Sequence, residues 1–453
     1  MSFSIFYPNG GAENSFIYLL TGILFLFAVI SFLKCQFDIL HPVVIYNLCL
    51  SGCCALAALY TDIWDLPMHF NTAMILIVMS ALFILGGVLA EFRCSASVNA
   101  GISETENKYL VGGFPISWPM WLLIMILLGV VLYFQYMSFL EAARQVTNET
   151  SLGKMTLAVL NGLRTQDISF SRWHAYRIRF ANIVAYVSIL AVWLNLSAHR
   201  YKDCIKWGIL ALTFIPFLIL TGGRQQFMYV ILFALVSFLL VRRKYFGKGT
   251  QSLRKELLLI GIAVGLFLFS FLGIGLVNGK VGAAVDSLKV IAHYAGTNIS
   301  AFDVYINEMV MADSPYIGTR TFCAIYNFLH NRGFDVPEYP MYIYLFTDFN
   351  AVTTNVYTAF YRYIHDFGYF GCGLVVFLLG FFYTFLYRQL YLHGLKNWMI
   401  LLYSSIVFPV FLMGREERFF NEIVNTANVS FLVGLFVLYK TFEILNERRR
   451  DGK

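Results

Sequence analysis

The stretch from Leu218 to Phe233 reads LILTGGRQQFMYVILF. An apolar run ends, Gly222 and Gly223 permit a tight turn, and Arg224 precedes a second apolar run. A guanidinium at this position either faces a cavity and acts on a ligand there, or snorkels from a short exposed hairpin. The same alternation of apolar runs and short polar turns recurs along the chain and indicates the fold class.

The composition is that of a membrane protein. The 453-residue chain is 59% hydrophobic and 13% charged, with a mean hydropathy of +0.67. A bilayer-spanning helix needs ~20 mostly apolar residues. We therefore predict an all-α polytopic membrane protein, a single integral membrane domain over 1–453 with about eleven transmembrane helices. The expected spans are Ser15–Leu33, His41–Tyr60, Phe70–Ala90, Trp118–Phe139, Phe180–Leu196, Ile205–Leu220, Phe227–Val241, Leu257–Val277, Phe367–Tyr387, Trp398–Met413 and Ala427–Leu445.

Several other classes of protein are not indicated. The net charge of +7 comes from basic residues scattered among short loops, so no nucleic-acid partner is expected. The eight cysteines lie mostly in or beside apolar runs, which predicts no disulfide framework. The first apolar run lacks the basic flank and cleavage site of a secretory signal. No His-Glu-x-x-His spacing, phosphate-binding loop or dinucleotide fingerprint is present, so no metal or other cofactor is expected.

Loop charges predict the orientation, because Lys and Arg accumulate in cytoplasmic loops. The strongest basic clusters, RRKYFGK from Arg242 and the terminal NERRRDGK, are placed inside. Glu141–Arg179, Asn278–Asp366 and Gly414–Glu422 then face outward with Arg224, and the N-terminus is also outside. Segment 278–366 is expected to be a large outer loop whose short helices cap an outer cavity.

The outward-facing basic residues are mostly arginines. Of 33 Lys and Arg residues, this topology places 14 outside, and 11 of those are Arg. Arg offers a planar fork that binds phosphate or carboxylate through two hydrogen bonds, whereas Lys is a point charge. The bias favours a phosphate-bearing or acidic ligand in an outer cavity. The alternative is that these arginines pair with loop carboxylates and anchor lipid headgroups.

A second candidate site is TTNVYTAFYRYIHDFGYFG, from Thr353 to Gly371. In a helix, Arg362 and Asp366 lie one turn apart on one face, with His365 beside them. An arginine, a histidine and a carboxylate together can hold an anion and accept a proton. The alternative is an intrahelical Arg–Asp pair with an interfacial His and an aromatic belt. The members of that belt would be Tyr357, Tyr361, Tyr363 and Tyr369.

Three weaker candidates complete the set. GREERFF places Arg415 and Arg418 around Glu416 and Glu417, and its alternative is a solvated, salt-bridged turn. NFLHNRGFDVPEYP offers polar side chains to a substrate, and a basic segment after the fourth span contains MTLAVL, which suits the membrane surface. The candidate catalytic residues are Asp366, His365, Arg362 and Arg224, and the candidate substrate-binding residues are Arg164, Arg172, Arg320, His330, Arg332, Tyr357, Tyr361, Arg415 and Arg418.

Two motifs and the layout resemble a known family. TGGRQQFMYVI matches a small-residue turn with an Arg at the outer end of a middle span, and TNVYTAFYRYIHDFGYFGCGLVVFLLG matches an aromatic entry into the span after a large outer loop. In both motifs, and in having many spans with one long external loop, the chain resembles bacterial oligosaccharide repeat-unit polymerases, the Wzy-type O-antigen polymerase family. The resemblance covers most of Phe180–Leu445.

The resemblance implies a GT-C-like membrane glycosyltransferase without a metal. Such an enzyme polymerises undecaprenyl-diphosphate-linked oligosaccharides for lipopolysaccharide at the periplasmic face of the bacterial inner membrane. Its partners would be that lipid-linked substrate, membrane lipids and a polysaccharide chain-length regulator. Arg224 and Arg362 would stabilise the diphosphate leaving group. Asp366 or His365 would take the proton of the acceptor hydroxyl, with Glu416 or Glu417 as the next candidates.

Two rival functions stay open. One is an O-antigen ligase or another GT-C transferase; the ligase would use the same donor with lipid A core as the acceptor. A transporter of the lipid-linked sugar would show inverted repeats and broken helices at mid-membrane. We find no internal repeat, and the ionisable residues sit at the predicted outer end of the spans.

The predicted orientation has a direct test. Alkaline phosphatase fused after Pro340 is expected to be active, and the same enzyme fused after Lys248 inactive, because its disulfides form only outside the reducing cytoplasm. Phosphatase activity and fusion level are measured together. The opposite pattern would place every outer candidate on the cytoplasmic face.

Overall fold

In the computed structural model, the residues described are 3–6, 15–98, 113–165, 168–221, 224–246, 254–262, 264–265, 287–308, 316–339, 345–350 and 352–451. The chain divides into two compact units. Unit 1 comprises Met1–Ile102, Asp286–Leu392 and Ile406–Val429, and unit 2 comprises Ser103–Val285, His393–Ser405 and Ser430–Lys453. That residues 1–453 form one integral membrane domain stays a prediction.

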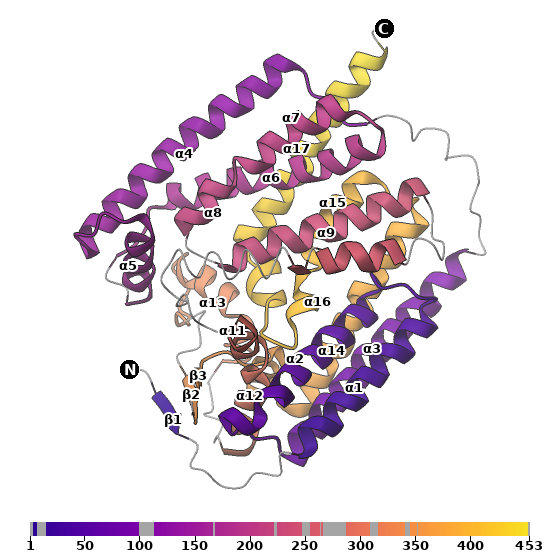
Figure 1. Ribbon diagram of the computed structural model, residues 1–453, viewed down its shortest axis with the longest axis vertical. Coiled ribbons are helices and arrows are strands. Elements are labelled where there is room, and N and C mark those ends of the chain that lie inside the picture. The colour runs from indigo at the N-terminus through magenta and orange to yellow at the C-terminus, as the bar shows by residue number, and fades with distance from the viewer. Residues whose placement is uncertain are drawn as a thin grey trace. The chain divides into compact units, whose positions relative to one another are not determined.

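Unit 1 is built around four long helices (Figure 1). They are α1 (Ser15–Lys34), α2 (Pro42–Trp64), α3 (Phe70–Val98) and α14 (Ala359–Leu392). The most extensive packing is between α3 and α14, followed by α1 on α2. Large apolar side chains such as Phe370 and Leu374 on α14 are exposed, as expected of a surface whose solvent is lipid.

Glycines allow α3 and α14 to approach closely. A Cβ added at Gly380 would lie 2.2 Å from the carbonyl oxygen of Phe83, and one at Gly86 would lie 2.1 Å from that of Phe377. Both clashes are with backbone atoms, which have little freedom to move. Small residues at such crossings are a common basis of helix packing in membranes.

We expect Gly380→Leu to destabilise unit 1 by at least about 1–3 kcal/mol, because it overpacks this contact. Gly52→Leu is the matched control, since nothing lies within 4 Å of a Cβ added there. The measurement is the thermal unfolding midpoint of each purified variant in detergent. Equal midpoints for the two variants would contradict the α3–α14 packing.

Short elements complete unit 1. The helices are α11 (Ser287–Ala295), α12 (Thr297–Glu308), α13 (Cys323–His330), α16 (Phe408–Leu412) and the π-helical turn η2 (Phe419–Ile423). A three-stranded sheet pairs β1 (Phe3–Phe6) in parallel with β2 (Leu345–Phe349), which pairs antiparallel with β3 (Val352–Thr354). The predicted outer loop thus contains the expected short helices and also two strands that the sequence analysis missed.

Unit 2 is helical in its described part. It contains α4 (Trp118–Val146), α5 (Leu152–Thr165), α6 (Arg172–Ser197), α7 (Tyr201–Leu212), α8 (Ile215–Thr221), α9 (Arg224–Phe246), α15 (Asn397–Ile406) and most of α17 (Thr426–Asp451). α6 packs mainly on α7 and α9. The outward loop expected over Glu141–Arg179 is mostly helix, because α4 continues to Val146 and α6 already begins at Arg172.

Nine helical segments in the described ranges are long and apolar enough to cross a membrane, and each coincides with one expected span. One of them, Tyr201–Thr221, consists of α7 and α8 together. The polytopic helical membrane class is therefore confirmed, whereas the count of eleven is not. Trp398–Met413 is divided into α15 and α16, both too short to span, with Pro409 near the break. Leu257–Val277 lies largely outside the described residues.

Candidate functional site

The candidate site in unit 1 is built on the first part of α14. Residues from Ala359 to Ile364 are buried, and the backbone N–H of Ala359 donates to the carbonyl of Met413 at 3.0 Å. The helix then bends at Gly368, whose φ of 66° and ψ of −174° suit glycine alone. The residues before Gly368 thus form a short helix packed in the protein, and the long apolar part of α14 follows.

Asp366 binds the backbone of the turn before α13. Its Oδ2 accepts the Thr321 N–H at 2.6 Å and the Arg320 N–H at 3.1 Å. These bonds occupy much of its capacity as a hydrogen-bond acceptor. Asp366, the residue predicted as a general base, therefore stabilises this turn.

Arg362 contacts the same segment and is only 8% exposed. Its Nη1 donates to the Arg320 carbonyl at 2.6 Å and lies 3.5 Å from the Cys323 Sγ. Arg362 and Asp366 share one helix face, as their spacing predicts. Among the described residues they form no ion pair, so the alternative of an intrahelical Arg–Asp pair is wrong; each side chain binds the 320–323 segment instead.

Arg320 itself extends toward an aromatic group. Its guanidinium carbon lies 5.3 Å from the centre of the Tyr361 ring. Tyr361 stacks on Tyr357 at 4.8 Å and meets the edge of Tyr305 at 4.5 Å. We refer to Arg320, Tyr305, Tyr357, Tyr361 and His365 as the Arg320 cluster. Within the described part of the chain, the Arg320 guanidinium is half-buried and has no hydrogen bond or carboxylate partner.

The positive charge of Arg320 is therefore stabilised mainly by the faces of aromatic rings and by nearby dipoles. Burial lowers the pKa of Arg320; Tyr305 and Asp366 act in the opposite direction, and Arg362 lowers the pKa further. Arg nevertheless stays protonated at any physiological pH. A half-buried cation with no carboxylate in direct contact attracts an anion more strongly than a cation in water does, because the surroundings screen it less. This favours an anionic ligand at the Arg320 cluster.

His365 is oriented by a neighbouring phenol. Its Nδ1 lies 2.9 Å from the Tyr305 hydroxyl. Burial raises the pKa of Tyr305 to about 12, so this phenol is neutral at physiological pH. Tyr357 bonds to the Thr347 hydroxyl at 2.8 Å, and burial raises its pKa to about 12 as well. The cluster therefore combines a cation, an imidazole and neutral phenols.

The expected aromatic belt is wrong for three of its four members. Tyr357, Tyr361 and Tyr363 are at most 1% exposed, whereas Tyr369 is 49% exposed. Belt residues lie at the lipid–water boundary, but these three pack inside unit 1 because the helix before Gly368 is covered by protein. Whether Tyr357 and Tyr361 bind a substrate stays a prediction.

GREERFF forms a salt-bridged turn. Arg415 and Arg418 both pair with Glu416, and Arg418 also pairs with Glu422. Burial acts to raise the pKa of Glu416, but the two arginines outweigh it and the pKa is lowered. Since Glu416 neutralises these arginines, the geometry favours the alternative over a role in substrate binding, although the turn is largely buried and not solvated.

Glu417 was one of the next candidates for the general base, and its carboxylate binds the backbone of the π-helical turn η2. Its carboxylate accepts the Phe420 N–H at 2.7 Å and the Asn421 N–H at 3.2 Å, and the Tyr363 hydroxyl donates to it at 3.3 Å. It is 4% exposed, and burial raises its pKa. These bonds fix η2 and leave little access for a substrate.

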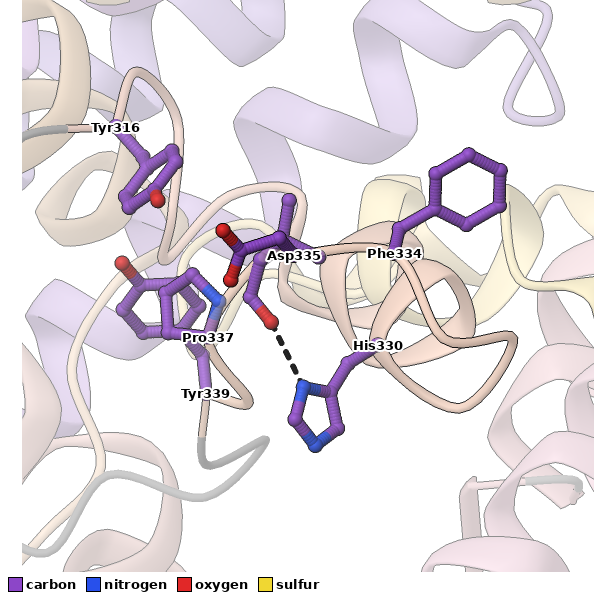
Figure 2. Close-up of a pocket in the computed structure, with 7 residues that line it drawn as sticks. Tyr316, His330, Phe334, Asp335, Pro337 and Tyr339 are labelled. Carbon is purple, nitrogen blue, oxygen red and sulfur yellow. Dashed lines mark hydrogen bonds between the residues drawn. The ribbon is translucent and has the colours of Figure 1, made fainter.

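His330 lines a surface pocket next to α13, separate from the Arg320 cluster. The pocket has a volume of about 610 Å³, and Figure 2 shows the Asp335 carboxylate near the rings of Tyr316 and Tyr339. The Nδ1 of His330 bonds to the Val336 carbonyl at 2.7 Å. Arg332 is not part of this lining; its guanidinium lies over the Phe328 ring at 4.9 Å.

The remaining candidates lie in unit 2. Arg224 is the first residue of α9, and Arg164 is near the end of α5, but both side chains and the Gly222–Gly223 turn lie outside the described residues. Arg172 is the exposed first residue of α6. Whether these arginines bind a ligand stays a prediction.

The MTLAVL segment, in α5, is covered by protein. Met155 and Val159 are buried against Phe139, Ala142 and Ala143 of α4. The apolar face expected to rest on the membrane surface therefore packs on α4 instead. The short helix itself is present, as an amphipathic pattern predicts.

Tyr305 is the cluster member that the sequence analysis missed. It lies on α12, and its partner His365 is 60 positions further along the chain. Its surroundings, YINEMV, carry no motif that marks it as functional. The only local signal was an aromatic residue in a loop already expected to cap the cavity.

Comparison with known proteins adds no further support. No family model matches this chain, and neither does any curated protein or solved structure.

Proposed function

We propose that this protein is a membrane glycosyltransferase that polymerises undecaprenyl-diphosphate-linked oligosaccharide repeat units at the periplasmic face. The reaction needs a lipid-embedded enzyme, an anion-binding group for the diphosphate and a base for the acceptor hydroxyl. Each requirement has a counterpart in unit 1, and the resemblance of the two sequence motifs supplies the substrate class.

The observation that carries the proposal is the Arg320 guanidinium. It is half-buried, lies on the Tyr361 ring and has no carboxylate partner among the described residues. Donors that are already oriented in a water-poor site stabilise developing negative charge without reorganising. Arg320 is therefore proposed to bind the diphosphate oxygen that leaves the donor sugar.

The proposed reaction is a single displacement at the anomeric carbon of the donor. The acceptor hydroxyl oxygen forms a bond to that carbon as the bond from the carbon to the diphosphate oxygen breaks. The electron pair of the broken bond leaves on undecaprenyl diphosphate, where Arg320 balances its charge. The hydroxyl proton passes to a base on the protein.

His365 is the better placed of the two predicted bases. When its Nδ1 carries a proton and donates to Tyr305, its Nε2 has a lone pair for the acceptor hydroxyl. Asp366 is occupied by the amides of Arg320 and Thr321. We therefore assign the base role to His365 and positioning roles to Asp366 and Arg362, which together hold the Arg320 backbone.

Deletion of the gene in its host tests the function. The expected result is loss of the polysaccharide ladder on a gel, with a single repeat unit still attached to lipopolysaccharide, and restoration by the wild-type gene. Complete loss of attached repeats would instead identify a ligase. Repeats trapped on the cytoplasmic side would identify a transporter, and an unchanged ladder would contradict all three functions.

A further inference from the structure

A second cluster of chemically reactive side chains lies in unit 1, where α1 connects to α2. Cys35 follows α1, His41 precedes α2, and Glu91 lies on α3. One potential ligand atom from each residue lies within 4.8 Å of the other two. His41 is 3% exposed, and Cys35 and Glu91 are partly exposed, so an ion could reach the group from solvent.

The connection is held in an uncommon conformation. Gln36 and Phe37 have φ values of 55° and 60°, a region that residues other than glycine seldom adopt. Asp38 fixes the segment, because its Oδ1 accepts the Leu40 N–H at 3.1 Å and its Oδ2 accepts the Tyr387 hydroxyl at 2.7 Å. The short loop thereby turns both Cys35 and His41 toward α3.

The binding capacity of this group is only partly used. Both contacts of the Glu91 carboxylate are made by its Oε1 atom. His41 Nε2 lies 3.1 Å from it, and Arg388 donates to it at 2.5 Å. Within the part of the chain that the structure describes, Glu91 Oε2 has no partner, and the buried His41 Nδ1 also has none. A buried nitrogen without a partner is costly unless something binds it.

We propose that Cys35, His41 and Glu91 bind a divalent transition metal ion of the zinc type. Thiolate, imidazole and carboxylate form a mixed ligand set typical of zinc and unlike the all-oxygen sets of calcium and magnesium. The zinc bond lengths to sulfur and nitrogen require the ligand atoms to approach to roughly 3.5 Å, about 1 Å closer than the present upper limit. The ion would fasten the α1–α2 connection to α3.

The proposed metal site is separate from the glycosyltransferase site. His365 lies just before the bend at Gly368, and the 20 positions of helix from Gly368 to Arg388 correspond to roughly 30 Å. Loop charges predict that the Arg388 end is cytoplasmic, where thiols stay reduced. The ion would therefore act on the structure of unit 1 and not on the sugar chemistry.

Zinc titration of the purified full chain tests the proposal. After treatment with a chelator and its removal, wild type is expected to take about one equivalent of Zn²⁺ in competition with a chromophoric chelator. Cys35→Ser, His41→Gln and Glu91→Gln should each weaken binding at least about tenfold. Cys204→Ser is the matched control because Cys204 is a half-buried thiol in unit 2, and it should bind zinc as wild type does. Equal uptake by wild type and Cys35→Ser would overturn the proposal.

A second measurement needs no variant and so does not depend on variant folding. Zn²⁺ is expected to slow maleimide alkylation of Cys35 in wild type, read by mass spectrometry, and to leave Cys204 unaffected. Alkylation of Cys35 at the same rate with and without Zn²⁺ would rule out a thiolate–metal bond. Neither readout involves polymer formation, so the outcome is independent of the proposed function.

Discussion

Replacing Arg320 by alanine is expected to lower the polymerisation rate by about 10²–10³, the loss found when one preorganised donor to a developing oxyanion is removed. Arg320 is the half-buried guanidinium of the cluster that has no carboxylate partner within the described ranges. Arg320→Lys keeps the charge but loses the planar fork and its stacking on Tyr361, so its rate should also drop, by a smaller factor. The rate is measured with purified enzyme and lipid-linked donor.

Arg200→Ala is the matched control for this substitution, because it removes the same side chain from an exposed position in unit 2. It is expected to polymerise at the wild-type rate. The backbone of Arg320, which binds Arg362 and Asp366, is retained in Arg320→Ala, so membrane level and thermal midpoint should also stay at the wild-type value. A fully active Arg320→Ala would remove the observation on which the proposed function rests.

The second large effect is expected at His365. His365→Ala should lower the rate by about 10²–10⁴, the usual contribution of a general base, while the protein inserts at a normal level. The donor should still bind, so the loss falls on the rate and not on affinity. Binding is followed by protection of the purified variant against thermal unfolding at increasing donor concentration.

Asp366→Asn serves as the comparison that separates chemistry from positioning. The neutral amide oxygen of Asn accepts the N–H groups of Arg320 and Thr321 more weakly than a carboxylate oxygen does, so this variant should lose about 1 kcal/mol of stability along with activity. If Asp366→Asn kept wild-type stability and lost only rate, whereas His365→Ala stayed active, the base would be Asp366. Full activity of both variants would place the base elsewhere.

Some of the site could be recognised from local sequence. The spacing of Arg362 and Asp366 correctly indicated one helix face, since positions four residues apart are related by helix geometry alone. The pairing of Arg418 with Glu422 is likewise an i, i+4 contact. The spacing did not show whether each charged side chain has a hydrogen-bond or ion-pair partner elsewhere in the protein. The partners of Asp366 lie about 45 positions away, on a turn whose place is determined by packing.

The sequence alone determined that the protein is a polytopic helical membrane protein, because spans depend on the length and apolar content of continuous segments, a local property. Only the tertiary structure distinguished Arg320 from Arg362, Arg415 and Arg418. Arg362, Arg415 and Arg418 are engaged by carbonyl or carboxylate groups, whereas Arg320 rests on Tyr361. Likewise, only folding brought Tyr305 to His365 and Glu91 to Cys35 and His41. Hydrogen bonding and charge compensation depend on groups far apart in the chain, and a linear pattern does not encode their distances.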